Sequence, residues 1–122
     1  MKEEKILFVD DDKNMRLLYE KVFSKEGYGV ILAASSEEAL DIIAKGEKID
    51  LIVLDIKMKG QSGLELLENL AKEKSKIPVI LCTAYSSYQD DYASWFADSY
   101  VVKSPDLSEL KKEIRRLLEK KK

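Results

Sequence analysis

Short apolar runs alternate along the chain with longer stretches in which apolar residues recur every three or four positions. The short runs are typical of buried strands, and the longer spacing is typical of helices with one apolar face. This alternation indicates a doubly wound α/β fold, in which a five-stranded parallel sheet carries helices on both faces. The strands are expected at residues 5–9, 29–33, 50–55, 78–82 and 100–102. The third run is apolar without a break from Leu51 to Leu54, which predicts a central strand.

The first two helices carry sequence signals at their ends. Asp12 is placed to cap the first helix, and Gly27 is placed to end it. Ser35 and Glu38 have the spacing of a capping box at the start of the second helix. The apolar face of the first helix is expected to consist of Met15, Leu18, Tyr19, Val22 and Phe23.

The stretch between the fourth and fifth strands, residues 86–98, is polar and aromatic and has weaker helix propensity than the others. We interpret its aromatic face as a cover for the sheet, and a partner-binding surface is the alternative. The last helix is expected at residues 107–118, with Asp106 or Ser108 as its cap. The aromatic face consists of Tyr88, Tyr92, Trp95 and Phe96.

The composition of the chain mainly excludes some classes of function. A length of 122 residues allows one core, so a single domain over residues 1–122 is expected. A net charge of −2 gives no basic excess for direct nucleic-acid binding. Because the chain has no histidine, imidazole catalysis and imidazole metal ligation are excluded. Cys82 is the only cysteine and is expected to be a small buried residue. The absence of a leader pattern and of an apolar run of ~20 residues predicts a cytoplasmic protein.

Candidate chemistry lies where the predicted strands end, because ligands of open parallel sheets bind at the carboxyl ends of the strands. Three carboxylates crowded there would repel one another unless a positive charge lies among them. An all-oxygen cluster suits a hard cation, and Mg²⁺ is the expected ion. A cation and an ammonium beside a carboxylate would stabilise an incoming phosphoryl group. The residues at these strand ends are Asp10, Asp11, Asp55, Thr83 and Lys103.

Four stretches in this order and spacing resemble those of bacterial two-component receiver domains. They are Ile6-Leu7-Phe8-Val9-Asp10-Asp11-Asp12, Leu51-Ile52-Val53-Leu54-Asp55, Thr83-Ala84 and Tyr100-Val101-Val102-Lys103. The resemblance covers nearly the whole chain. It implies a (βα)5 flavodoxin-like receiver fold of the single-domain, chemotaxis-response-regulator type.

The resemblance also implies a reaction. Asp55 would be the nucleophile that takes a phosphoryl group from a phosphohistidine on a sensor histidine kinase or a histidine phosphotransfer protein. Mg²⁺ would be held by Asp10, Asp11 and Asp55, and by the backbone carbonyl of Lys57. The chain would thus not be a conventional enzyme, although it would catalyse its own phosphorylation and dephosphorylation.

Further roles follow from the same resemblance. Lys103 would pair with the phosphoryl oxygens, Thr83 would move toward them, and Tyr100 would rotate inward behind it. This switch would reshape the face formed by the fourth helix, the fifth strand and the last helix, to which a downstream target protein would bind. We also hypothesise that Lys57 and Tyr85 shield the acyl phosphate from water and lengthen its life.

Two positions depart from the pattern of the family. Lys59 stands where proline is usual, and Ser104 stands where a proline in a cis peptide normally follows the lysine. Either a non-proline cis bond forms at Lys103–Ser104, at a cost of ~3 kcal/mol, or the loop is built differently.

Two alternative functions remain open at this point. The first is a pseudo-receiver that binds partners and is never phosphorylated. The intact acidic cluster argues against it, and the departures at Lys59 and Ser104 keep it open. The second is a Mg²⁺-dependent phosphohydrolase resembling the haloacid dehalogenases, because Asp10 and Asp12 have the spacing of the acidic pair of that family. The short chain and an unexplained Asp55 argue against the second.

Overall fold

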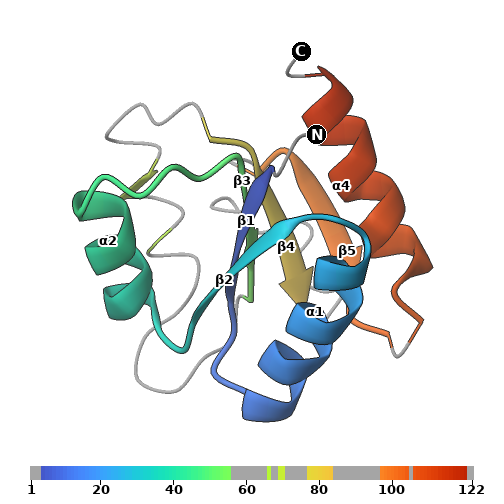
Figure 1. Ribbon diagram of the computed structural model, residues 1–122, viewed down its shortest axis with the longest axis horizontal. Helices are drawn as coiled ribbons and strands as arrows, with labels where there is room; N and C mark the ends of the chain where they lie inside the picture. Colours follow the sequence, from blue (N-terminus) through green and yellow to red (C-terminus); the bar gives the residue numbers. More distant parts are fainter. Residues whose placement is uncertain are drawn as a thin grey trace.

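Five parallel strands form one sheet in the computed structural model, in the order β2-β1-β3-β4-β5 (Figure 1). The structure describes residues 4–55, 66, 69–70, 77–83, 97–104 and 106–120. The doubly wound α/β fold and the central position of the third strand are therefore confirmed. The elements are β1 (Lys5–Val9), α1 (Lys13–Lys25), β2 (Gly29–Ala33), α2 (Ser36–Ala44), β3 (Leu51–Leu54), β4 (Val79–Thr83), β5 (Ser99–Val102) and α4 (Ser108–Lys120).

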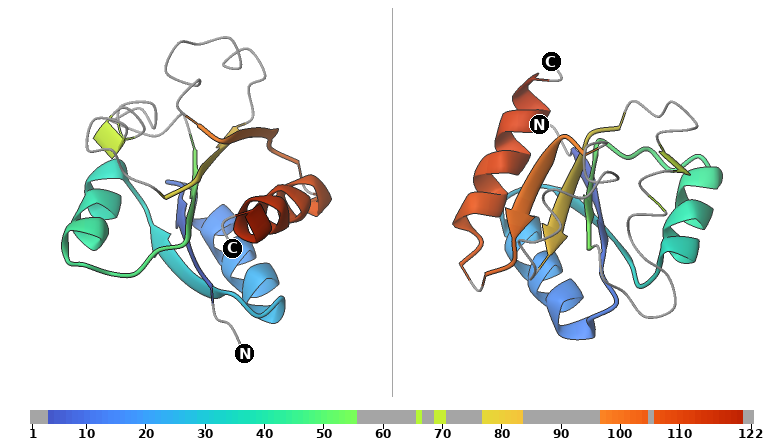
Figure 2. Two further views of the ribbon diagram at one scale, coloured as in Figure 1. Left: turned by 90° about the horizontal axis from the view of Figure 1, so that it is seen from above. Right: turned by 180° about the vertical axis from the view of Figure 1, so that it is seen from behind.

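Helices lie on both faces of this sheet: α2 covers one face, and α1 and α4 cover the other (Figure 2). Successive strand residues point to opposite faces, so each strand contributes to two cores. In β1, Ile6 and Phe8 pack on the side of α1 and α4, whereas Leu7 and Val9 pack on the side of α2. All four are at most 1% exposed. This double burial explains why the strand sequences are apolar without alternation.

The helix caps follow the sequence signals closely. The carboxylate of Asp12 accepts a hydrogen bond from the amide two residues later, as expected of the cap of α1. The hydroxyl of Ser35 accepts from the amide of Glu38 at 3.1 Å, and the carboxylate of Glu38 accepts from the amide just before the cap. At α4, the carboxylate of Asp106 accepts from the amide and the hydroxyl of Ser108. Asp106 is thus the capping side chain, and Ser108 is its donor.

Several element boundaries, including the start of β5 at Ser99, differ by one or two residues from the prediction. β3 is shorter than expected, because Asp50 and Asp55 flank it. β4 begins one residue later than expected, since Pro78 has no amide hydrogen and takes part only through its carbonyl, which accepts from Ile52. The last helix extends two residues beyond the expected end, to Lys120.

Parts of the prediction lie outside the described residues. These include most of the stretch 86–98 with its aromatic face, and Lys59 in the loop after β3. Of the third predicted helix, Leu66 and Leu70 are helical and buried. Within the described ranges, none of the helices is long and apolar enough to cross a membrane.

Candidate functional site

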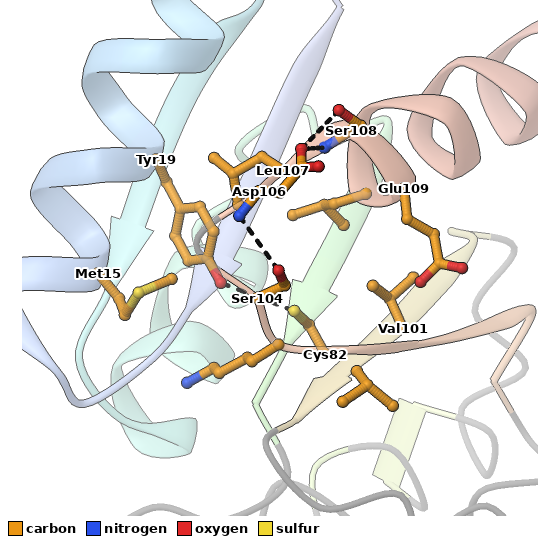
Figure 3. Close-up of a pocket in the computed structure, with 12 residues that line it drawn as sticks. Met15, Tyr19, Cys82, Val101, Ser104, Asp106, Leu107, Ser108 and Glu109 are labelled. Carbon is orange, nitrogen blue, oxygen red and sulfur yellow. Dashed lines mark hydrogen bonds between the residues drawn. The ribbon is translucent and has the colours of Figure 1, made fainter.

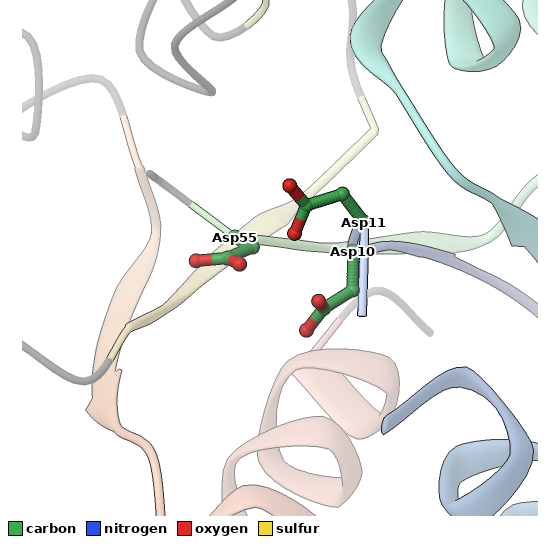
Figure 4. Close-up of side chains that lie close together, drawn as sticks. All are labelled: Asp10, Asp11 and Asp55. Carbon is green, nitrogen blue, oxygen red and sulfur yellow. The ribbon is translucent and has the colours of Figure 1, made fainter. Parts of the chain in front are cut away.

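Three carboxylates meet where β1 and β3 end. Val9 and Leu54 are paired in the sheet, so the residues that follow them, Asp10 and Asp55, become neighbours. The amide of Asp55 donates to the carbonyl of Val9 at 2.9 Å, which fixes this register. One carboxylate oxygen each from Asp10, Asp11 and Asp55 lies within 4.8 Å of the others (Figure 4). The strand register therefore brings together the predicted acidic cluster.

Burial makes this cluster electrostatically costly. Asp10 is 1% exposed and Asp55 is 6% exposed. Carboxylates at this depth are poorly hydrated, and like charges nearby oppose ionisation. The protein therefore has to supply positive charge or hydrogen-bond donors at this edge of the sheet.

Lys103 supplies that charge from the end of β5. Its ammonium nitrogen lies 2.8 Å from Oδ2 of Asp10 and 3.1 Å from Oδ2 of Asp55. Burial alone would disfavour the charged ammonium, but its contacts with Asp10 and Asp55 outweigh this and raise the pKa of Lys103. The lysine is thus charged at neutral pH. One ammonium among three carboxylates still leaves the cluster negative.

The loop after β5 has an ordinary peptide bond between Lys103 and Ser104. The described residues contain no cis peptide bond, so the Lys103–Ser104 bond is trans. The hydroxyl of Ser104 accepts from the amide of Asp106 at 3.1 Å, and this contact shapes the turn before α4. The second of the two expectations is therefore correct: the loop is built differently, and Lys103 still reaches the acidic cluster.

The donor set fits a hard divalent cation. Oδ1 of Asp10 accepts from the amide of Asp12 at 2.9 Å. Oδ2 of Asp10 is buried, and the described protein gives it the Lys103 ammonium as a neighbour but no well-aligned hydrogen bond. Buried carboxylate oxygens without nitrogen or sulfur ligands are what Mg²⁺ prefers. Asp12 caps α1, is exposed and lies outside the cluster, as expected.

The remaining predicted site residues are described only in part. Thr83 is the last residue of β4 and pairs with Val102, but the predicted role of its hydroxyl lies outside the described part of the structure. Tyr100 is half-buried and packs against the core on the side of α2. Its switch role stays a prediction. Lys57 and Tyr85 lie outside the described residues, so their effect on phosphate lifetime also stays a prediction.

Beside the site lies a cavity that the sequence did not reveal. It has a volume of about 270 Å³ and lies between α1 and the loop joining β5 to α4 (Figure 3). Met15 and Tyr19 line it from α1, Leu107 lines it from the loop, and Lys103 connects it to the acidic cluster. Residues from distant segments form this cavity, and no local pattern marks them as neighbours.

Cys82 lies at the floor of this cavity and is expected to react slowly with thiol reagents. It is 3% exposed, and burial raises its pKa to about 11, from the ordinary value of 9.0. At pH 8 the reactive thiolate is therefore about a hundredfold scarcer than for an ordinary thiol. Alkylation by iodoacetamide should be slower by at least this factor in the native protein than in urea. Equal rates in the two states would contradict this burial.

The comparisons with known proteins agree with this geometry. The sequence profile of the response regulator receiver domain matches residues 6–115. The sporulation initiation phosphotransferase F of Bacillus subtilis is 37% identical over 120 residues, which cover 97% of this chain and 96% of that protein. The transcriptional regulatory protein YvrH of the same organism is 42% identical over 98% of this chain, but this chain spans only 51% of its length.

Two solved structures extend these similarities. The response regulator protein TrrA from Thermotoga maritima, in complex with Mg²⁺-BeF, is 45% identical, with a TM-score of 0.89 over 93% of this chain and 98% of that chain. A structure of the histidine kinase ThkA in complex with TrrA matches with a TM-score of 0.87 and 45% identity, over 94% of this chain and 98% of the matched chain.

Proposed function

This chain belongs to the response regulator receiver domain family of two-component signalling, and from that premise we propose that Asp55 is its phosphoacceptor. The observation that carries the proposal is the position of Asp55. Its buried carboxylate lies 3.1 Å from the ammonium of Lys103, and its ligand oxygen lies within 4.8 Å of those of Asp10 and Asp11. We propose that Mg²⁺ binds at these three carboxylates.

The reaction that fits this site is a phosphoryl transfer. An oxygen of Asp55 forms a bond to phosphorus, the bond from phosphorus to the donor imidazole nitrogen breaks, and the electron pair leaves with the imidazole. Bound Mg²⁺ would neutralise charge on the phosphoryl oxygens. Lys103 holds its ammonium beside the same carboxylate, and the low exposure of Asp55 limits competing water.

The direct test is phosphorylation by a small phosphodonor. The chain is incubated with acetyl phosphate or phosphoramidate, with Mg²⁺ or with EDTA, and its intact mass is recorded. A single phosphoryl adduct that requires Mg²⁺ supports the proposal. If Mg²⁺ binds and no adduct forms, the pseudo-receiver alternative is correct.

The partner proposed for this chain is a sensor histidine kinase or a histidine phosphotransfer protein. TrrA forms a complex with the histidine kinase ThkA, and it is 45% identical to this chain. The cavity between α1 and the loop before α4 opens beside Lys103, so a partner that reaches Asp55 would cover it. A downstream target protein, the absence of direct nucleic-acid binding and a cytoplasmic location stay predictions.

Replacing Met15 with alanine is expected to slow phosphotransfer from the partner but not from acetyl phosphate. Met15 lines the cavity and is half-buried, so a docked protein would contact it, whereas a small donor would not. We expect about a tenfold lower transfer rate from a phosphorylated histidine kinase that is active on the wild type. Transfer is measured by radiolabel on the two proteins.

Val22→Ala is the matched control for this experiment. Val22 packs on the same core as Met15 but lies seven residues further along α1, or about 10 Å from it. It should leave both reactions unchanged. If Met15→Ala lowers the phosphotransfer rate equally for the kinase and for acetyl phosphate, the effect is structural. That result would argue against docking at this cavity.

A further inference from the structure

Arg16 makes a contact at the acidic site that the proposed reaction does not use. It lies in the second turn of α1 and is half-buried. Its guanidinium nitrogen Nη1 donates a hydrogen bond of 2.7 Å to the backbone carbonyl of Asp10, six residues earlier. The side chain therefore connects the first helix to the end of β1.

This contact completes the fixation of Asp10. The amide of Asp10 donates to the carbonyl of Ala33 at 3.0 Å, and Oδ1 of Asp10 accepts from the amide of Asp12 at 2.9 Å. The carbonyl of Asp10 lies beyond the end of β1, and Arg16 provides its donor. With these contacts Oδ2 is left facing Lys103 in the acidic cluster.

The turn held in this way also carries Asp11, the third carboxylate of the cluster. Asp11 lies between Asp10 and Asp12, and both of these neighbours are fixed by hydrogen bonds. Restraining the carbonyl of Asp10 therefore limits the positions that the Asp11 carboxylate can take. A hydrogen bond from a charged donor is stronger than a neutral one, which suits this role.

We propose that Arg16 is a positioning residue for the cation site, because its guanidinium fixes the turn that presents Asp10 and Asp11. The inference rests on the proposed function, since it assumes that these carboxylates bind Mg²⁺. Arg16 also brings a positive charge near the site, and that charge alone would weaken cation binding. If Arg16 acts by positioning, its replacement should weaken Mg²⁺ binding. If it acts only through its charge, its replacement should strengthen Mg²⁺ binding.

The test compares the Mg²⁺ affinity of three variants by isothermal titration with MgCl₂. Arg16→Met removes both the donor and the charge, and Arg16→Lys restores a charged donor. Lys13→Met removes an exposed charge from the first turn of the same helix. We expect Arg16→Met to bind Mg²⁺ about tenfold more weakly, as for other supporting contacts of metal ligands. Arg16→Lys should recover part of this loss, and Lys13→Met should bind as tightly as the wild type or more tightly.

A second readout uses the metal-free protein. The amide of Asp12 donates a hydrogen bond to Oδ1 of Asp10, so its hydrogen exchange is expected to be slow, and this exchange can be followed by NMR. If Arg16 fixes this turn, Arg16→Met should raise the exchange rate of Asp12 about tenfold, while the amides of β1 keep their protection. Retained protection in β1 also shows that the variant is folded.

The outcomes separate this inference from the proposed function. If Arg16→Met binds Mg²⁺ as tightly as the wild type, or more tightly, the positioning role is wrong. An unchanged Asp12 exchange rate in a folded variant also overturns it. If the wild type binds no Mg²⁺, the proposed function is wrong, and this inference is wrong with it.

Discussion

Asp55→Asn is expected to abolish the Mg²⁺-dependent phosphoryl adduct. The amide is nearly the same size as the carboxylate, and its oxygen can still accept from Lys103, which lies 3.1 Å from the native carboxylate. It lacks the anionic oxygen that attacks phosphorus, so the rate should fall by at least about 10³-fold. Intact mass after incubation with acetyl phosphate and Mg²⁺ measures the loss.

Asp12→Asn is the matched control for this variant. It removes one carboxylate from the same edge of the sheet, and asparagine caps helices about as well as aspartate does. It should therefore keep the adduct and the stability of the wild type. If Asp12→Asn abolished the adduct and Asp55→Asn did not, the chemistry would be that of the phosphohydrolase alternative, which uses Asp10 and Asp12. An adduct that persists on Asp55→Asn would place the phosphoacceptor elsewhere.

The acidic cluster could be predicted from the sequence because each of its members lies within two residues of the end of a strand. Asp10 and Asp55 come after apolar runs whose period and length identify strands. In a parallel sheet the carboxyl ends of the strands lie at one edge, so the order of the residues already predicts that they meet. Lys103 was predicted by the same rule, although its loop departs from the family pattern.

Other contacts could not be predicted from the sequence. They are made by long side chains that reach from one secondary-structure element to another. The hydrogen bond from Arg16 to Asp10 runs from a helix back to a strand end, and sequence spacing alone does not predict it. The bond between Lys103 and Ser104 is trans, and the hydroxyl of Ser104 accepts a hydrogen bond from the amide of Asp106, a contact that the family pattern gave no reason to expect. The cavity beside Lys103 likewise needs the positions of α1 and the loop before α4.

The charges at the site also connect stability with function. Among the described residues, Lys103 contacts both Asp10 and Asp55. A bound divalent cation would neutralise the same carboxylates. The ammonium and the metal can therefore each stabilise the same cluster. Removal of the ammonium should make the stability of the fold depend more on the metal.

Lys103→Met is accordingly expected to destabilise the metal-free protein by about 3 kcal/mol, because it leaves buried carboxylates without their cation. Urea unfolding in EDTA measures this loss, and Mg²⁺ should restore part of it. The same variant should bind Mg²⁺ more tightly and accept phosphate from acetyl phosphate at least about a hundredfold more slowly, because the ammonium no longer stabilises the transferred group.

The pH dependence of this stability difference follows from the pKa of Lys103. That pKa is raised in the folded protein above its ordinary value of 10.5, so the contribution of Lys103 is fully present below pH 10.5 and is lost as pH rises through the folded value. The difference between wild type and Lys103→Met should then be constant from about pH 6 to 9.

A surface ion pair between α4 and the end of α1 provides the matched control for Lys103→Met. The ammonium of Lys111 lies 3.6 Å from the carboxylate of Glu26, and both side chains are more than a third exposed. Such pairs contribute little to stability. Lys111→Met should therefore lower the free energy of unfolding by less than about 1 kcal/mol and leave phosphorylation unchanged. If Lys103→Met were no less stable than Lys111→Met in EDTA, the carboxylates of the site would not depend on Lys103.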